Sequence, residues 1–259
     1  MIQALKDFYD REYQSDQYAA TRNAEEHAFY PVLKSFIHEY HLREKRCLEI
    51  GCGRGAFQDM VADYTGVDIS DSVRPYFHKS FQQASATALP FDDGTFDAIW
   101  SYAVLEHIPE PEKALSEIRR VLSNNGLLLL APAWQCRPWA GEGYAVRPFS
   151  DFNWKGKLIK LSIPVRDSVV YRSLRVFPAR FRHLLEYQRR HHPTVFRYRR
   201  LKANFEEYWV SDSDAINDMD PFEAYLWFVS RGDRCLNYRS LKAAFLIRTG
   251  ALAFQKTGT

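Results

Sequence analysis

The sequence predicts an α/β fold organised around a parallel, doubly wound sheet. Residues 44–133 alternate apolar strands with helical segments, which is the pattern of strands joined by crossover helices. The first of these strands runs directly into a glycine-rich loop over residues 47–55, where such sheets bind a cofactor. With 259 residues, 46% of them apolar, the chain can bury one complete core.

Residues 1–43, which precede this alternation, are predicted to form helices. Leu33, Phe36 and Ile37 recur at helical spacing, and Pro31 suits the first turn of a helix. Two roles remain open for this region. It either covers the cofactor or only completes the hydrophobic core.

The glycine loop reads Glu49-Ile-Gly51-Cys-Gly53-Arg-Gly55 and marks the cofactor site. Alternate glycines let the backbone turn sharply and approach a ligand without Cβ collisions. Gly51, Gly53 and Ala56 also satisfy the Gly-x-Gly-x-x-Ala pattern of dinucleotide-binding loops. The negative charge of Glu49 favours a ligand that carries a sulfonium and an ammonium group over one that carries a pyrophosphate.

Further motifs follow the loop in a fixed order. Asp68 ends the next predicted strand, 17 residues after Gly51, where an acid binds ribose hydroxyls in doubly wound folds. The subsequent motifs are Leu89-Pro-Phe91, Phe96-Asp97, Leu105-Glu-His-Ile108, Arg120-Val-Leu122 and the strand Gly126-Leu-Leu-Leu-Leu-Ala131.

This order resembles the class I S-adenosylmethionine (SAM) dependent methyltransferases typified by ubiquinone and menaquinone biosynthesis enzymes. The resemblance covers residues 44–133, the SAM-binding core. It implies a seven-stranded Rossmann-like doubly wound sheet, with residues 1–43 as an N-terminal helical cover. Residues 134–259 would then hold a basic helical insert after the fifth strand, at about 150–205, and the closing part of the core. The implied SAM-binding residues are Glu49, Gly51, Cys52, Gly53, Gly55, Asp68, Ile69, Ser85, Ala86 and Ser101.

One of these positions departs from the family. Ser85 stands where relatives often have an Asp that accepts from the adenine amino group. A hydroxyl can accept the same hydrogen bond, but without charge assistance the bond is weaker.

The insert is strongly basic. Residues 155–202 contain four lysines and ten arginines against two acids, a net charge of +12 in a chain whose total is +3. Aromatic and aliphatic residues interleave these charges, so ordered helices are expected rather than a disordered tail. Four interpretations of the insert remain open. It could be a solvated structural surface, or it could bind an anionic membrane or a lipid-diphosphate-linked substrate, a phosphorylated or nucleotide-linked sugar, or nucleic acid. Nucleic acid is least favoured because no RNA-binding module is recognisable.

Residues 211–223 invite a calcium-loop interpretation that fails, because Asn217 stands at the position that requires glycine. The segment instead predicts a helix with Asp220 as its N-cap and Glu223 as capping-box partner. Three roles remain open for Asp212 and Asp214: they could be solvated loop residues, bind substrate hydroxyls, or act as a base. Neither the cysteines nor the histidines show zinc spacing, so no metal site is predicted.

The predicted function is O-methylation of a saccharide or lipid-linked glycan at the cytoplasmic membrane face. The catalytic base would be His107, because it follows the fourth strand. His191 and His192, in the insert, are the alternative. The acceptor is a small molecule or glycolipid, with or without phosphate. An isoprenoid quinone or other lipophilic acceptor is the second possibility, and a SAM-binding regulatory subunit without catalysis is the third. The N-terminus lacks a signal-peptide core, so a cytoplasmic protein, with peripheral membrane contact as an option, is expected.

Overall fold

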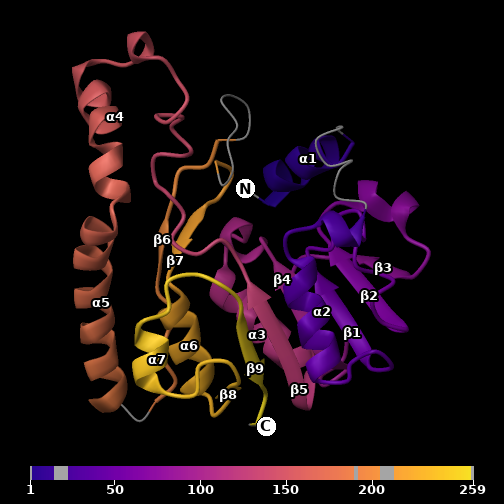
Figure 1. The fold of residues 1–259 in the computed structure, drawn as a ribbon. Helices are drawn as coiled ribbons and strands as arrows, with labels where there is room; N and C mark the ends of the chain where they lie inside the picture. Colours follow the sequence, from indigo (N-terminus) through magenta and orange to yellow (C-terminus); the bar gives the residue numbers. More distant parts are fainter. Residues whose placement is uncertain (1, 15–22, 190–191, 205–212, 258–259) are drawn as a thin grey trace.

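The computed structural model describes residues 2–14, 23–189, 192–204 and 213–257, and its centre is a seven-stranded sheet (Figure 1). The strand order is β3-β2-β1-β4-β5-β9-β8. β1 to β5 are parallel, whereas β9 runs antiparallel to both β5 and β8. The strands are β1 (Arg46–Ile50), β2 (Asp63–Asp68), β3 (Ser80–Gln83), β4 (Phe96–Tyr102), β5 (Leu122–Ala131), β8 (Arg234–Cys235) and β9 (Leu252–Gln255). The predicted mixed α/β fold with seven strands is confirmed.

Helices cover both faces of this sheet. The helices of the described residues are α1 (Ile2–Glu12), α2 (Tyr30–Glu39), α3 (Pro111–Val121), α4 (Trp154–Asp167), α5 (Val169–Arg189), α6 (Pro221–Val229) and α7 (Leu241–Phe245). Of these, α2 covers one face, and α3 and α6 cover the other. Successive residues of a strand point to opposite faces, so Cys47 packs with α2 whereas Leu48 packs in the cluster that includes α3 and α6. Both faces are therefore buried, as a parallel sheet requires.

Two predicted helix positions can be compared directly with the structure. α2 contains Pro31 in its first turn and buries Leu33, Phe36 and Ile37, as its spacing predicts. α6 is capped by Asp220, whose side chain accepts a hydrogen bond of 2.8 Å from the amide of Phe222. The prediction that Glu223 is the capping-box partner of Asp220 is wrong, because the carboxylate of Glu223 pairs with the imidazole of His183 on α5 instead.

The segment after β5 contains the two longest helices, α4 and α5, which stand end to end beside the rest of the molecule (Figure 1). Arg180 attaches α5 to the core. Its buried guanidinium lies 2.7 Å from Asp220 and donates to the carbonyl of Ile247 at 2.6 Å. A small hairpin, β6 (Tyr198–Arg200) with β7 (Asn217–Met219), lies between these helices and the sheet.

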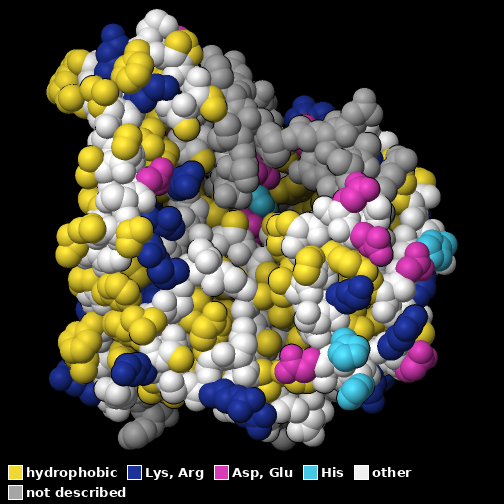
Figure 2. Space-filling model, in the orientation of Figure 1, with side chains coloured by type: hydrophobic (Ala, Val, Ile, Leu, Met, Phe, Trp, Pro, Cys, Tyr) yellow, Lys and Arg dark blue, Asp and Glu magenta, His cyan; other side chains and the backbone are white. Residues whose placement is uncertain are grey.

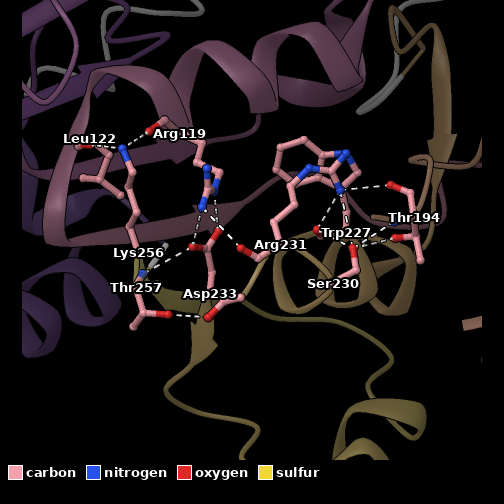
Figure 3. A network of polar contacts seen from close by, with 10 residues as sticks. Arg119, Leu122, Thr194, Trp227, Ser230, Arg231, Asp233, Lys256 and Thr257 are labelled. Carbon is pink, nitrogen blue, oxygen red and sulfur yellow. Dashed lines mark hydrogen bonds and ion pairs between the residues drawn. The ribbon is translucent and has the colours of Figure 1, made fainter. Parts of the chain in front are cut away.

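A polar network joins the end of α3, the start of β5 and the residues after β9, at the edge of the sheet opposite the carboxyl ends of its parallel strands (Figure 3). Arg119, at the end of α3, lies 2.8 Å from Asp233. Lys256 donates to the carbonyls of Arg119 and Leu122 at 2.9 and 2.7 Å, and its burial lowers its pKa. These contacts hold the antiparallel β9 against β5. Among the described residues, no helix combines the length and hydrophobicity that a bilayer-spanning segment requires.

Candidate functional site

A cavity of about 330 Å³ lies at the C-terminal ends of β1, β2 and β4. This is the edge where ligands bind in open α/β sheets. Besides the glycine loop and the two residues that follow it, Ala56 and Phe57, its lining comes from several segments. They are α1 with the residue after its end (Leu5, Tyr9, Tyr13), His27, the end of β2 and the next residue (Val67, Asp68, Ile69), the turn after β3 (Ala84, Ser85, Ala86, Thr87), the end of β4 and the segment after it (Tyr102, Ala103, Val104, His107, Ile108, Pro109, Glu110) and Asp214.

Most of the predicted cofactor residues share this cavity. The lining includes Glu49, Gly51, Cys52, Gly53, Asp68, Ile69, Ser85 and Ala86, together with the predicted base, His107. It does not include Gly55 or Ser101. Gly55 serves packing, since a Cβ there would lie 2.7 Å from the Phe77 ring. Ser101 is buried within β4, where it pairs in register with Ile50 of β1 and Leu130 of β5.

The conformation of the glycine loop explains why it needs glycine. Gly51 has φ of +72°, and a Cβ at this position would lie 2.0 Å from a methyl carbon of Val104. Gly53 has φ of +48° and faces the ring of Tyr13, the residue after the end of α1. The loop can therefore bring its backbone close both to the segment after β4 and to α1.

Glu49 is a buried carboxyl group at the wall of the cavity. The hydroxyl of Tyr64 donates a hydrogen bond to it. Burial nevertheless raises the pKa of Glu49 to about 8, because a charged carboxylate is costly away from water. A cation that reached the cavity beside Glu49 would favour the ionised form of this acid.

Asp68 is the second buried acid of the cavity. It accepts hydrogen bonds of 3.0 Å from the amides of Gly53 and Ser70, and one of 3.3 Å from the hydroxyl of Tyr13. Burial raises its pKa, although these hydrogen bonds act against the rise. Asp68 thus links the glycine loop to α1.

Ser85 has local partners. Its hydroxyl lies 2.8 Å from that of Thr87 and accepts from the Thr87 amide at 3.3 Å. The side chain therefore stabilises the turn after β3 and lines the cavity at the same time.

His107 is brought to Asp214 by a contact between distant segments. Nδ1 of His107 lies 3.3 Å from Asp214, and the hydroxyl of Tyr9 donates to the same carboxylate at 2.9 Å. The backbone explains this arrangement, because the amide of Ile216 donates to the carbonyl of Glu106 at 3.0 Å. The Nε2 atom of His107 lies 3.8 Å from Glu106. A carboxylate beside an imidazole orients the ring and stabilises the imidazolium that forms when the ring takes a proton.

The sequence analysis offered three other base candidates, namely Asp212, His191 and His192. Asp212 and His191 lie outside the described residues, and His192 is not part of the lining. Of the two loop aspartates whose role the sequence leaves open, Asp214 is the one found beside His107.

Several lining residues escape the sequence analysis, among them Tyr9, Tyr13 and Arg54. Tyr9 on α1 and Tyr13, just after the end of α1, are four residues apart, and their rings stack with centroids 5.5 Å apart. Arg54 donates from Nε to the carbonyl of Tyr13 at 2.8 Å and lies over the ring of Tyr76. The spacing of the two tyrosines was a usable signal, whereas nothing in the sequence links Arg54 to Tyr13.

The sequence matches a known family model, described as a methyltransferase domain, over residues 48–130. Three curated relatives illustrate the similarity. An uncharacterised protein of Methanocaldococcus jannaschii is 31% identical over 50% of this chain and 60% of its own length. The sterol 4-C-methyltransferase of Caenorhabditis elegans is 30% identical over 35% of this chain and 34% of its own length. The chloroplastic tocopherol O-methyltransferase of Arabidopsis thaliana is 30% identical over 40% of this chain and 34% of its own length.

The chain thus spans between about a third and three fifths of the length of these relatives. The matched region coincides with the strands β1 to β5 and with the walls of the cavity that they carry. Residues 48–130 therefore match the methyltransferase domain family, in agreement with the resemblance to class I SAM-dependent methyltransferases that the sequence motifs indicate.

Proposed function

We propose that the protein transfers the methyl group of SAM to a hydroxyl of a saccharide or lipid-linked glycan, with His107 as the general base. The observation that carries this proposal is the arrangement of His107, Asp214 and Tyr9 at the cavity that also contains Glu49 and Asp68. Named relatives that are methyltransferases favour an enzyme over a SAM-binding regulatory subunit.

The residues of the cavity fit SAM. The glycine loop at Gly51 and Gly53 leaves room for a close backbone approach, and Glu49 supplies a buried carboxyl group for the cofactor's ammonium. Asp68 would accept hydrogen bonds from ribose hydroxyls, and Ser85 with Ala86 would border the adenine. Bound SAM supplies an electrophilic methyl group on a sulfonium.

The chain itself would supply proton transfer and orientation. As the acceptor oxygen forms its bond to carbon, the hydroxyl proton passes to His107, and Asp214 stabilises the resulting imidazolium. Tyr9, by donating to Asp214, fixes the carboxylate against the ring. The side chain of His107 is only 14% exposed, so few water molecules compete with the acceptor.

The lining also supports a sugar as the acceptor. The aromatic rings of Tyr9, Tyr13 and Tyr102 offer apolar faces that sugars stack against, whereas Glu110 and Asp214 can accept hydrogen bonds from hydroxyl groups.

A lipophilic acceptor such as an isoprenoid quinol is the second candidate. It is favoured by the apolar side chains of Leu5, Phe57, Val104 and Ile108 in the same lining. The names of the sterol and tocopherol methyltransferases among the relatives also point to lipophilic acceptors.

The test is methyl transfer from radiolabelled SAM to a panel of purified acceptors. The panel contains an isoprenoid-diphosphate-linked saccharide, the free saccharide, a demethylated quinol and an amine. We expect label in an alkali-stable ether of the saccharide. Label only in the quinol would favour the second candidate, and label only on the amine would refute O-methylation.

Two variants test the base. We expect His107→Gln to lower kcat by about 10²- to 10⁴-fold while SAM binding by calorimetry is retained. Asp214→Asn should lower kcat less and change the pH profile, because it acts through His107. The matched control is His78→Gln, since His78 forms a comparable pair with Asp59, at 2.8 Å, on the surface. Full turnover by His107→Gln would eliminate His107 as the base.

A further inference from the structure

The outer side of α4 and α5 carries an unusual concentration of exposed apolar side chains. Among the described residues, nine of the fourteen large hydrophobic residues that are strongly exposed belong to these two helices. Eight of them have exposed fractions between 57% and 71%. Seven of these eight recur at helical spacing, and we call these seven the apolar stripe: Trp154, Leu158, Leu161, Val165, Val170, Leu174 and Phe181. Exposure on this scale is uncommon on a protein surface without a partner.

The spacing of the apolar stripe shows that it forms one continuous face. On α4, Trp154 is followed by members four, seven and eleven residues later. On α5, Val170 is followed by members four and eleven residues later. These intervals place side chains on one side of a helix. Figure 2 shows the hydrophobic side chains gathered along the edge of the molecule that α4 and α5 form in Figure 1.

Cationic side chains flank the apolar stripe. Within α4 and α5 there are nine lysines and arginines against two acids, and two of the nine, Arg175 and Arg180, are bound to Asp218 and Asp220 on the side that faces the protein. Lys155, Lys157 and Arg182 form no ion pair with any other described residue, so their charges are available to an external anion. Lys155 and Trp154, which begin the stripe, are residue types that occur where a helix meets the polar boundary of a lipid layer.

We propose that the apolar stripe and its flanking cations bind the surface of an anionic phospholipid bilayer. The apolar side chains would enter the boundary between headgroups and acyl chains, while the lysines and arginines bind lipid phosphates. This surface lies outside the cofactor cavity, and binding to it requires neither SAM nor acceptor. The inference therefore stands or falls independently of the proposed function.

The charge pattern favours a lipid surface over a second copy of the chain. A symmetric dimer would place the stripe of one protomer, with its excess of positive charge, against the identical stripe of its partner. Like charges at an interface disfavour association. An anionic bilayer instead complements the same charges.

The attachment of α5 to the core makes the stripe a rigid platform. Arg180 is buried and bound to Asp220, and Arg175 lies 3.1 Å from Asp218. Both bonds lie on the side of α5 that faces the protein, so the opposite side is held outward without support from other described elements.

The experiment is co-sedimentation of the purified protein with vesicles of phosphatidylcholine alone and of phosphatidylcholine mixed with phosphatidylglycerol. We expect binding to the anionic vesicles that weakens with salt. Quenching of tryptophan fluorescence by lipids brominated on their acyl chains reports insertion. This quenching should fall in Trp154→Phe, which removes one of the six tryptophans.

Matched pairs of variants separate the two contributions. Lys155→Glu with Lys157→Glu should weaken binding to anionic vesicles at least tenfold, whereas Lys34→Glu with Lys45→Glu, elsewhere on the surface, should not. Val170→Ser should weaken binding several-fold, and Val32→Ser on α2 should leave it unchanged. Circular dichroism confirms that each variant is folded.

Two results would overturn the inference. One is equal sedimentation of the wild type and the Lys155/Lys157 variant with anionic vesicles, or no sedimentation of either. The other is a concentration-dependent dimer, seen by light scattering, that Val170→Ser dissociates while vesicle binding is absent. That second result would assign the stripe to a second copy of the chain.

Discussion

Glu49 offers a direct test of how the cavity would hold SAM. Its side chain belongs to a residue that is 5% exposed, and burial raises its pKa to about 8. We predict that SAM binds with its ammonium group beside the ionised form of this acid, because a buried ammonium without a counter-ion is strongly disfavoured. Binding of SAM should therefore release a proton from Glu49 below about pH 8.

The size of the effect follows from this pKa. About half of the Glu49 carboxyl groups are ionised at pH 8, and about 1% at pH 6. The association constant for SAM should therefore fall about 50-fold from pH 8 to pH 6. Folding responds to the same group. Since the pKa in the folded protein lies above the ordinary value of 4.5, the free protein should lose stability as the pH rises from about 4.5 to about 8.

The assay is isothermal titration calorimetry with SAM across this pH range, in buffers of different ionisation enthalpy. Glu49→Gln keeps the shape of the side chain but cannot titrate. The affinity of this variant for SAM should be weaker than that of the wild type by about 2 kcal/mol at pH 8. It should also be nearly constant between pH 6 and pH 8. The control is Glu110→Gln, which changes another acid of the cavity lining and should keep the wild-type slope. A wild-type affinity that is constant between pH 6 and pH 8, or a Glu49→Gln protein with the wild-type slope, would refute the reasoning.

Three further changes test the fold. Gly51→Ala should lower the free energy of unfolding by about 2 to 5 kcal/mol, because its Cβ would collide with Val104 at a positive φ; urea denaturation measures this, and an unchanged midpoint would contradict it. Arg180→Leu should lower the free energy of unfolding by about 3 to 5 kcal/mol, because Asp220 loses its buried partner. Thermal melting measures this change, and a melting temperature close to that of the wild type would contradict it. Burial raises the pKa of Cys47 to about 12 and all four thiols are buried, so a thiol reagent at pH 8 should modify none before denaturation; rapid labelling of the native protein would contradict this burial.

The strands of the core and the acids at their ends could be predicted because their signals are local. The glycine loop, Glu49 and Asp68 lie within about 20 residues of one another, and their spacing follows from a strand, a turn and the next strand. The family resemblance also implied Ser101 as a cofactor residue, whereas the cavity lining does not include it. β4 is buried on both faces, so an alternation of polar and apolar residues that would distinguish its two sides is missing.

Contacts between distant segments could not be predicted in the same way. Asp214 reaches His107 because the amide of Ile216 donates to the carbonyl of Glu106, which is a tertiary contact without a local pattern. Glu223 was predicted to cap its own helix, but His183 from α5 provides a different partner. The composition of the insert predicted ordered basic helices. It did not reveal that their outward side is apolar, because that requires knowledge of which side packs on the core.

The hydrogen bond from Tyr13 to Asp68 bears on the kinetics of cofactor loading. A ribose hydroxyl that bound Asp68 would displace the tyrosine, and Arg54, which holds the Tyr13 carbonyl, would transmit the displacement to the end of α1. Loading would then begin with a unimolecular opening of this helix, followed by capture of the nucleoside. In stopped-flow fluorescence we expect the observed rate to reach a plateau at high SAM concentration and to lose that plateau in Tyr13→Phe.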